Sequence, residues 1–272
     1  MNRVFCSTGA FLGRPNKRDF HLIEEIAPRL SCDGFELMIY NTWYDKLTEL
    51  IDYLGKISFK PKIIHFDKMI GENISHATKE STTIASCDFV LNCEIAKALH
   101  ARYAVLHLWG GLDSDSNFEN NIKAYEKFEK IATEYGITLL IENIVCTTKD
   151  PFSRLDELSK LFPSAHFVLD TKMAQFHSQL SKRDLNKYKH LFLENKILHM
   201  HINDYGGRHM EWERLKTLHI GRGNIDFEML FSFLREVGYS GTFTVEGTSF
   251  DSNGIVDTVS LNSDFEYIKA HI

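Results

Sequence analysis

Residues 196–207, KILHMHINDYGG, decide how the rest of the chain is interpreted. The apolar residues between Ile197 and Ile202 are typical of a buried strand, yet His199 and His201 lie among them. The strand is followed at once by an Asn-Asp pair and two glycines. Polar groups are costly to bury unless they are paired, so this strand is expected to end in a polar site and not in plain core.

Seven other short runs rich in β-branched and apolar residues alternate with longer segments. With the segment above, the predicted strands are Arg3–Ser7, Gly34–Ile39, Lys62–Phe66, Tyr103–Leu108, Thr138–Glu142, His166–Asp170, Ile197–Ile202 and Thr242–Glu246. The predicted helices between and after them are residues 19–30, 43–54, 80–101, 117–135, 153–162, 184–196, 227–238 and 256–272.

Eight strands alternating with eight helices predict an α/β fold, a parallel (β/α)8 TIM barrel formed by one domain over residues 1–272. The alternative is an open doubly wound sheet, which usually carries a Gly-rich phosphate turn after its first strand. The segment STGAFLGR is too loose a match to such a turn. Five prolines and the absence of low-complexity tracts argue against a flexible linker.

Composition narrows the class of protein. The formal charge of −6 gives no support to a nucleic-acid partner, and no apolar run is long enough to span a membrane. The five cysteines form no Cys-x-x-Cys pair, and the first residues lack a secretory pattern, so a cytoplasmic location with reduced thiols is expected.

Six titratable or metal-binding side chains fall at or near the ends of six predicted strands: His65, His107, Glu142, Asp170, His201 and Glu246. The strands of a parallel barrel all end at one face, where active sites lie. Any one of these residues alone is more often an ordinary hydrogen-bonding group, but six on one rim favour a shared site. Three carboxylates and one imidazole among them suit Mn²⁺, Mg²⁺ or Co²⁺, with Zn²⁺ as an alternative.

The motifs GFEL, HFD, HLWGG, LLIEN, LDTK, HMHIND, HIGRGNIDF and TVEG together resemble those of the sugar isomerase/epimerase superfamily. These are the xylose isomerase-like TIM barrels, which also include the endonuclease IV type of abasic-site nucleases. The resemblance extends over nearly the whole chain. It implies metal ligation by Glu142, Asp170, His201 and Glu246, and substrate contacts from His65, His107 and Arg208.

Two further residues are candidate substrate contacts. Lys172 lies two residues after Asp170 and could reach a carboxylate, phosphate or hydroxyl; the alternative is a solvated lysine at a helix start. Asn143 could bind a sugar hydroxyl or support a ligand, and a turn-forming role is an equal alternative.

The predicted activity is a metal-dependent sugar isomerase or epimerase that acts on a sugar, sugar phosphate or keto-polyol. Glu142 and Glu246 would be the catalytic bases that transfer a proton next to the carbonyl, through a metal-stabilised enediolate. The expected partner is a small-molecule sugar or sugar derivative, with no membrane and no nucleic acid, and a homo-oligomer is compatible with the sequence. Neither the substrate nor the choice among epimerase, isomerase, dehydratase and lyase follows from the residues.

Two alternatives remain open. By the resemblance, an endonuclease IV-like enzyme needs a trinuclear zinc site, but Met173, Leu215 and Thr217 stand where its third zinc would take ligands. The nearby His177, His209 and His219 leave a shifted arrangement open. A metal-free small-molecule-binding barrel predicts neither a metal nor turnover, and it leaves the four ligand-type residues without a role.

Overall fold

The computed structural model describes residues 3–59 and 61–272. Eight strands are hydrogen-bonded in chain order and close into a barrel, because β8 pairs in parallel with β1. They are β1 (Val4–Ser7), β2 (Gly34–Met38), β3 (Pro61–His65), β4 (Tyr103–Leu106), β5 (Thr138–Glu142), β6 (His166–Asp170), β7 (Ile197–Ile202) and β8 (Thr242–Val245). This topology is that of a TIM barrel and confirms the fold class predicted from the sequence.

The chain divides into two compact units, Met1–Glu36 with Leu169–Ile272, and Leu37–Val168. Strands β2 and β6 each cross from one unit to the other, since Glu36 and Leu169 are boundary residues. The predicted extent of the barrel domain, residues 1–272, stays a prediction.

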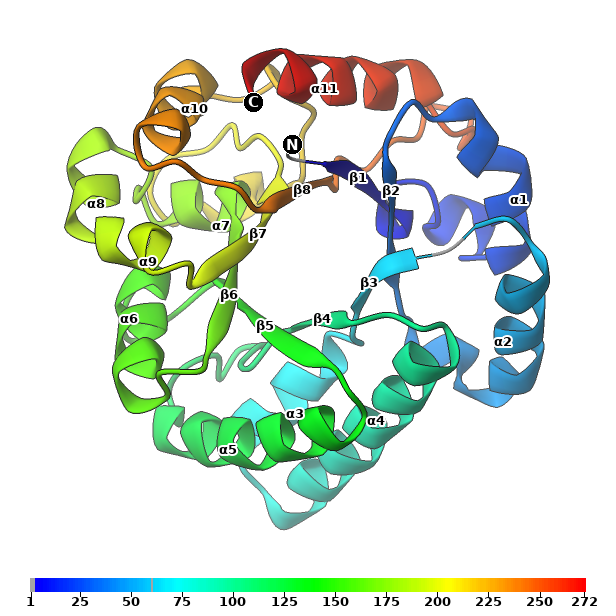
Figure 1. The fold of residues 1–272 in the computed structure, drawn as a ribbon, viewed down its shortest axis with the longest axis horizontal. Coiled ribbons are helices and arrows are strands. Elements are labelled where there is room, and N and C mark those ends of the chain that lie inside the picture. Colours follow the sequence, from blue (N-terminus) through cyan, green and yellow to red (C-terminus); the bar gives the residue numbers. More distant parts are fainter. Residues whose placement is uncertain (1–2, 60) are drawn as a thin grey trace. The chain divides into compact units, whose positions relative to one another are not determined.

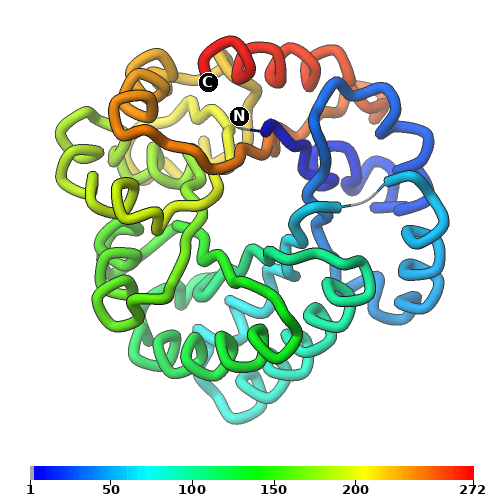
Figure 2. The backbone as a smooth tube through the Cα atoms, viewed as in Figure 1, coloured from blue at the N-terminus to red at the C-terminus, as the bar shows by residue number. Residues whose placement is uncertain are grey.

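In the first unit, the last strand of the barrel lies beside the first, as the tube in Figure 2 shows. Their register places Cys6 opposite Val245, and β7 continues the sheet with His201 opposite Thr244. Helices α10 (Phe227–Glu236) and α11 (Thr258–His271) lie on the outer side of these strands in Figure 1. Phe231 of α10 packs against Phe243 of β8, with ring centroids 6.0 Å apart.

In the second unit, β3, β4 and β5 carry α3 (Met69–His76), α4 (Lys79–Ala98) and α5 (Phe118–Glu134) on their outer side (Figure 1). The apolar spacing that predicts α5 corresponds to its buried face, which includes Tyr125 and Phe128. Phe128 stacks on Phe89 of α4 with ring centroids 4.0 Å apart. Phe89 also packs against Phe66, which follows β3, with ring centroids 5.4 Å apart, so α4 contacts both α5 and the end of a strand.

The remaining helices are α1 (Ile23–Ile26), α2 (Leu47–Lys56), α6 (Pro151–Leu161), α7 (Thr171–Phe176), α8 (Lys182–Lys187) and α9 (Lys189–Leu193). Short 3₁₀ segments occur at Thr8–Ala10, Arg14–Asn16, Phe20–Leu22, Ala27–Arg29, Asn41–Lys46 and Trp212–Arg214.

Two predicted helices are interrupted. Residues 19–30 form a single α-helical turn, α1, between 3₁₀ segments, because Pro28 lacks the amide hydrogen that would continue an α-helix. Residues 184–196 form α8 and α9, separated at Tyr188. Helices α3 and α7 were not predicted. None of the helices in the described part of the chain is long and apolar enough to cross a membrane.

Candidate functional site

The two histidines of β7 point to the same side of the strand, as residues two apart must. The Nε2 atom of His199 lies 3.0 Å from Glu36 Oε2, and that of His201 lies 3.2 Å from the same oxygen. The hydroxyl of Thr244, on β8, also donates to Glu36 Oε2 at 3.0 Å. All four side chains are buried, so the histidines of the opening motif are paired through one carboxylate of β2.

Glu36 is held as a carboxylate. Burial alone would raise the pKa of its carboxyl group, but the charge of His201 and hydrogen bonds from both histidines lower it well below the usual value. Burial also lowers the pKa of His199, so a neutral His199 donates Nε2–H to Glu36. The other ring nitrogen of His199 lies 2.7 Å from the Thr242 hydroxyl, which can donate to it.

The same carboxylate determines which nitrogen of a neutral His201 carries the hydrogen. Because ionised Glu36 only accepts hydrogen bonds, the hydrogen of a neutral His201 lies on Nε2. The lone pair is then on Nδ1, which lies 3.5 Å from Glu246 Oε1. This arrangement, a carboxylate that holds the outer nitrogen of a ligand histidine, is common around protein metal sites.

Asp170, His201 and Glu246 each offer one ligand atom, and these atoms lie within 4.8 Å of one another. The Nδ2 group of Asn203 lies 3.0 Å from Asp170 Oδ2 and 3.5 Å from Glu246 Oε2, so it contacts both carboxylates. Two acidic groups held this close repel each other unless a cation or proton lies between them. The buried Oδ1 atom of Asn203 has no hydrogen-bond partner among the described residues, which leaves an oxygen free at the same place.

A second cluster lies in the other unit, where β3, β4 and β5 end. Glu142 Oε2 lies 2.7 Å from His107 Nε2 and 3.2 Å from His65 Nε2. One ligand atom from each of the three residues lies within 4.8 Å of the others. Burial, more than any other effect, lowers the pKa of His107 to about 4, although the Glu142 charge opposes the shift.

The tautomer of His65 is determined by the backbone. Its Nδ1 atom lies 2.9 Å from the carbonyl oxygen of Phe66, which can only accept, so Nδ1 carries the hydrogen. A neutral His65 therefore presents a lone pair to Glu142 Oε2. The contact therefore brings two acceptor atoms together, and a metal ion or a proton between them would bridge them.

The other predicted site residues differ in their surroundings. Lys172 is buried at 8% exposure, which contradicts the reading of a solvated lysine. Asn143 is fully buried, and its backbone N–H donates to the Val168 carbonyl at 3.3 Å. Arg208 is exposed, and its backbone N–H donates to the Glu211 carboxylate at 2.8 Å. Arg208 as a substrate contact stays a prediction.

Asp204, in the opening motif, organises a loop. Its Oδ1 accepts from the backbone N–H groups of Tyr205 and Ile225, and its Oδ2 accepts from those of Gly221 and Gly223. A Cβ atom on Gly223 would lie 2.4 Å from Asp204 Oδ1, so this position needs glycine. The motifs HIND and GRGNID are therefore adjacent in the fold, because the carboxylate of Asp204 in the first accepts hydrogen bonds from the turn that the second forms.

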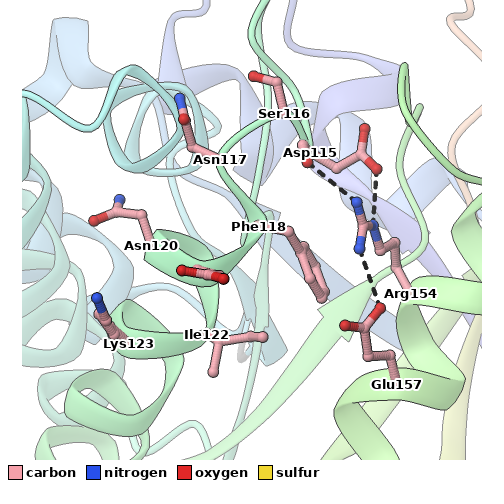
Figure 3. A pocket seen from close by; sticks show the side chains of 10 residues that line it. Asp115, Ser116, Asn117, Phe118, Asn120, Ile122, Lys123, Arg154 and Glu157 are labelled. Atoms are coloured by element: carbon pink, nitrogen blue, oxygen red, sulfur yellow. Dashed lines mark hydrogen bonds and ion pairs between the residues drawn. The ribbon is translucent and has the colours of Figure 1, made fainter.

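Figure 3 shows a pocket of about 520 Å³ beside the first turns of α5 and α6. None of the predicted site residues lines it. Arg154 in its wall is paired with Asp115 Oδ2 at 2.8 Å and with Glu157 Oε2 at 3.1 Å, and it lies over the ring of Phe118. Its charge is neutralised by its own neighbours, so this pocket is not the candidate site.

Residues 25–261 match the family described as xylose isomerase-like TIM barrel. The chain belongs to this family. Among curated proteins, it is 28% identical over 168 residues to the L-ribulose 3-epimerase of Methylomonas sp. (strain DH-1), an alignment that covers 59% of this chain and 52% of that protein. The chain spans about half the length of the curated relatives it matches.

Solved structures share the family's fold over the whole chain. One is a D-allulose 3-epimerase from Methylomonas sp. in complex with D-allulose, with a TM-score of 0.72 and 17% identity, covering 100% of this chain and 97% of that chain. Another is an IOLI protein with a binding zinc atom, with a TM-score of 0.68 and 18% identity, covering 99% and 96% of the two chains. At these identities the likeness shows the fold alone.

Proposed function

We propose that this protein is a divalent-metal-dependent sugar epimerase or isomerase. The observation that carries the proposal is the convergence of Asp170, His201 and Glu246, whose ligand-type atoms lie within 4.8 Å of one another. Membership of the xylose isomerase-like family and similarity to a sugar 3-epimerase support the same activity.

In this proposal the metal ligands are Asp170, His201 and Glu246, with Glu142 as the fourth. Support for Glu142 comes from topology, since it ends β5 and the strands of a parallel barrel end at one face. Carboxylate oxygens and one imidazole nitrogen favour Mn²⁺, Mg²⁺ or Co²⁺, and zinc is compatible with the same set. When bound, such an ion would act as a Lewis acid on the oxygens of a ketose.

The protein groups proposed to move protons are Glu142 and Glu246. A proton taken from the carbon next to the carbonyl by Glu142 could be held at Oε2, which His107 and His65 contact. Return of a proton from Glu246 to the opposite face would give epimerisation, whereas a single base acting at two carbons would give isomerisation. His65 and His107 would also contact the hydroxyls of the sugar.

The endonuclease alternative is disfavoured by one contact. The ammonium of Lys172 lies 3.2 Å from the hydroxyl of Thr217. By the family resemblance, Thr217 stands where the abasic-site nucleases have a ligand of the third zinc. A buried cation there would repel a metal ion. The metal-free binding barrel would have to retain close acidic groups without the ion that offsets their repulsion.

The test combines metal analysis with solvent exchange. We expect one divalent ion per chain by elemental analysis, and we expect the metal-loaded protein to exchange ketose hydrogen with deuterium from solvent, followed by NMR. D-allulose and L-ribulose are the first substrates to try. Three tightly bound zinc ions would contradict the proposal. A protein that binds no divalent ion and exchanges no hydrogen with solvent for any ketose tested would also contradict it.

A further inference from the structure

Lys172 is a buried cation at the carboxyl ends of the barrel strands. It is the second residue of α7, directly after the proposed ligand Asp170 at the end of β6. Its side chain reaches Thr217, whose neighbour Leu218 pairs with Asp204 just beyond β7. The ammonium therefore lies between the segments that follow two ligand-bearing strands.

The backbone around Lys172 is fixed in place. The Thr171 hydroxyl lies 2.6 Å from the carbonyl oxygen of Asn203 and 3.2 Å from that of His201. Asp170 Oδ1 accepts from the backbone N–H of Met173 at 2.8 Å. These bonds tie the first turn of α7 to the end of β7, so the lysine is positioned together with the ligand strands.

The charge of Lys172 lacks a counter-ion within the described part of the chain. Its ammonium has three N–H donors, and the described residues offer it one acceptor, Thr217 Oγ1 at 3.2 Å, and no carboxylate. Lysines are almost never this buried unless paired, because removing an ammonium from water without a partner is costly. The Thr217 hydroxyl, which accepts from Lys172, still has its own hydrogen to donate.

We propose that Lys172 and Thr217 bind an oxyanion carried by the substrate, so that the preferred ketose bears a carboxylate or a phosphate. This inference rests on the proposed function and specifies its substrate class. One ammonium and one hydroxyl match the two oxygens and the single charge of a carboxylate most closely. A sugar phosphate also offers anionic oxygens that accept hydrogen bonds.

Three probes that differ only at the terminal carbon test this inference: D-fructose, D-fructuronate and D-fructose 6-phosphate. Binding to the metal-loaded protein is measured by isothermal titration calorimetry. We expect at least one anionic probe to bind about tenfold or more tightly than D-fructose, which is about 1.4 kcal/mol. The stronger of the two anionic probes identifies the carboxylate or the phosphate as the source.

The Lys172→Met variant keeps an unbranched side chain of similar length and removes the charge, so the ratio between the affinities for anionic and neutral probes should fall to about one. Lys216→Met is the matched control, because it removes an exposed ammonium from the same loop as Thr217 and should leave the ratio unchanged. Thermal unfolding of both variants verifies that they fold.

A purely structural lysine gives a different result. Thr217→Val removes the hydrogen bond and keeps the ammonium of Lys172. If Lys172 and Thr217 only held the loop in place, Lys172→Met and Thr217→Val would lose similar stability. Neither would then change the ratio between the affinities for anionic and neutral probes. That outcome, or equal affinity of the wild-type protein for all three probes, overturns the inference. Solvent exchange is a separate measurement: anion preference without any exchange would contradict the proposed function, and the anion site at Lys172 and Thr217 would stand without it.

Discussion

The Nε2 atom of His201 lies between the two oxygens of Glu36, 3.2 Å from one and 3.1 Å from the other. Glu36 is fully buried, and its other contacts come from His199 and Thr244. A carboxylate in this position fixes the imidazole with its Nδ1 lone pair towards Asp170 and Glu246. We propose that Glu36 positions His201 as a ligand.

Glu36→Gln should therefore weaken metal binding by about 10- to 100-fold, the usual effect of losing such a partner. A glutamine can present an N–H to His201 and so favour the wrong ring nitrogen. Metal titration gives the affinity, and the visible absorption spectrum of the Co²⁺-loaded protein reports the ligand geometry. Thr244→Val, which removes one of the hydrogen bonds to Glu36, should produce a smaller change in both. Unchanged affinity and an unchanged Co²⁺ spectrum in Glu36→Gln would show that Glu36 only fills the core.

Glu142→Gln and Glu246→Gln should each reduce turnover by about 10²- to 10⁴-fold, the usual contribution of a general acid or base. Each change removes a proton-transfer group and one negative charge while it keeps the side-chain volume. Steady-state kinetics and deuterium incorporation measured on the same samples check the result. Glu213→Gln, an exposed change, is the control. Full activity in both site variants would rule out these residues as the bases, and wild-type turnover without solvent exchange would favour a hydride shift.

Acid stability depends on a different group. Asp115 accepts from the Thr147 and Thr148 backbone N–H groups at 2.7 and 2.9 Å and from Arg154 Nε at 2.8 Å. Burial alone would raise the pKa of its carboxyl group, but hydrogen bonds from Thr148, Arg154 and Thr147 lower it well below the usual value. A depressed carboxyl pKa stabilises the fold above the unfolded value of about 3.9 and loses that effect as pH falls through the folded value.

Asp115→Asn should therefore lower the free energy of unfolding by about 1.5–3 kcal/mol near neutral pH, because it removes the charged hydrogen bonds of Asp115 and leaves Arg154 with Glu157 as its remaining carboxylate partner. The difference from wild type should shrink as pH falls below about 4, since the unfolded wild-type chain then takes up the proton. Denaturant unfolding at several pH values checks both effects. A difference that stays constant down to low pH would mean that the Asp115 charge does not contribute.

The strands and the main helices could be predicted because their signals are local. Apolar runs and helical spacing are contained in a few residues, and β5, β6 and β7 begin and end where predicted. Helix α3 gave no such signal, because Gly71 weakens its helical propensity. That glycine is required by packing: a Cβ atom there would lie 2.4 Å from the carbonyl oxygen of His107.

Part of the candidate site could be predicted because its signal is also local in the sequence. Strand ends mark ligand-type residues, so Asp170, His201 and Glu246 could be grouped from the chain alone. Glu36 could not, because its partners His199 and Thr244 lie 163 and 208 residues away. The one local signal was a lone acidic residue between Phe35 and Leu37 in the predicted second strand. A charge inside a buried strand needs a partner, which is the same argument that singles out the histidines of β7.

Binding of nucleic acid distinguishes the two enzyme classes considered for this barrel, the sugar epimerase or isomerase and the abasic-site nuclease. An abasic-site nuclease must hold a phosphate backbone, and its affinity falls steeply with salt as Lys and Arg contacts release counterions. This chain carries 31 basic and 37 acidic residues. The loop after β7 carries four exposed basic residues, Arg208, Arg214, Lys216 and Arg222, and Lys172 is buried. Glu211 and Glu213 lie among them in the chain, so the loop offers no continuous basic surface to follow a duplex.

We therefore expect no cleavage of abasic DNA by the metal-loaded protein and no salt-sensitive binding of duplex DNA at physiological ionic strength. The assay follows nicking of a labelled abasic duplex beside a known abasic-site endonuclease as positive control, with Mn²⁺, Mg²⁺, Co²⁺ and Zn²⁺ tested separately. Binding is measured at two salt concentrations. Nicking that needs metal and disappears in Glu142→Gln would replace the sugar epimerase with a nuclease, while the barrel and its ligand cluster would stay as described. Nicking that persists in Glu142→Gln would instead indicate a contaminating nuclease, because the proposed metal site would no longer be complete.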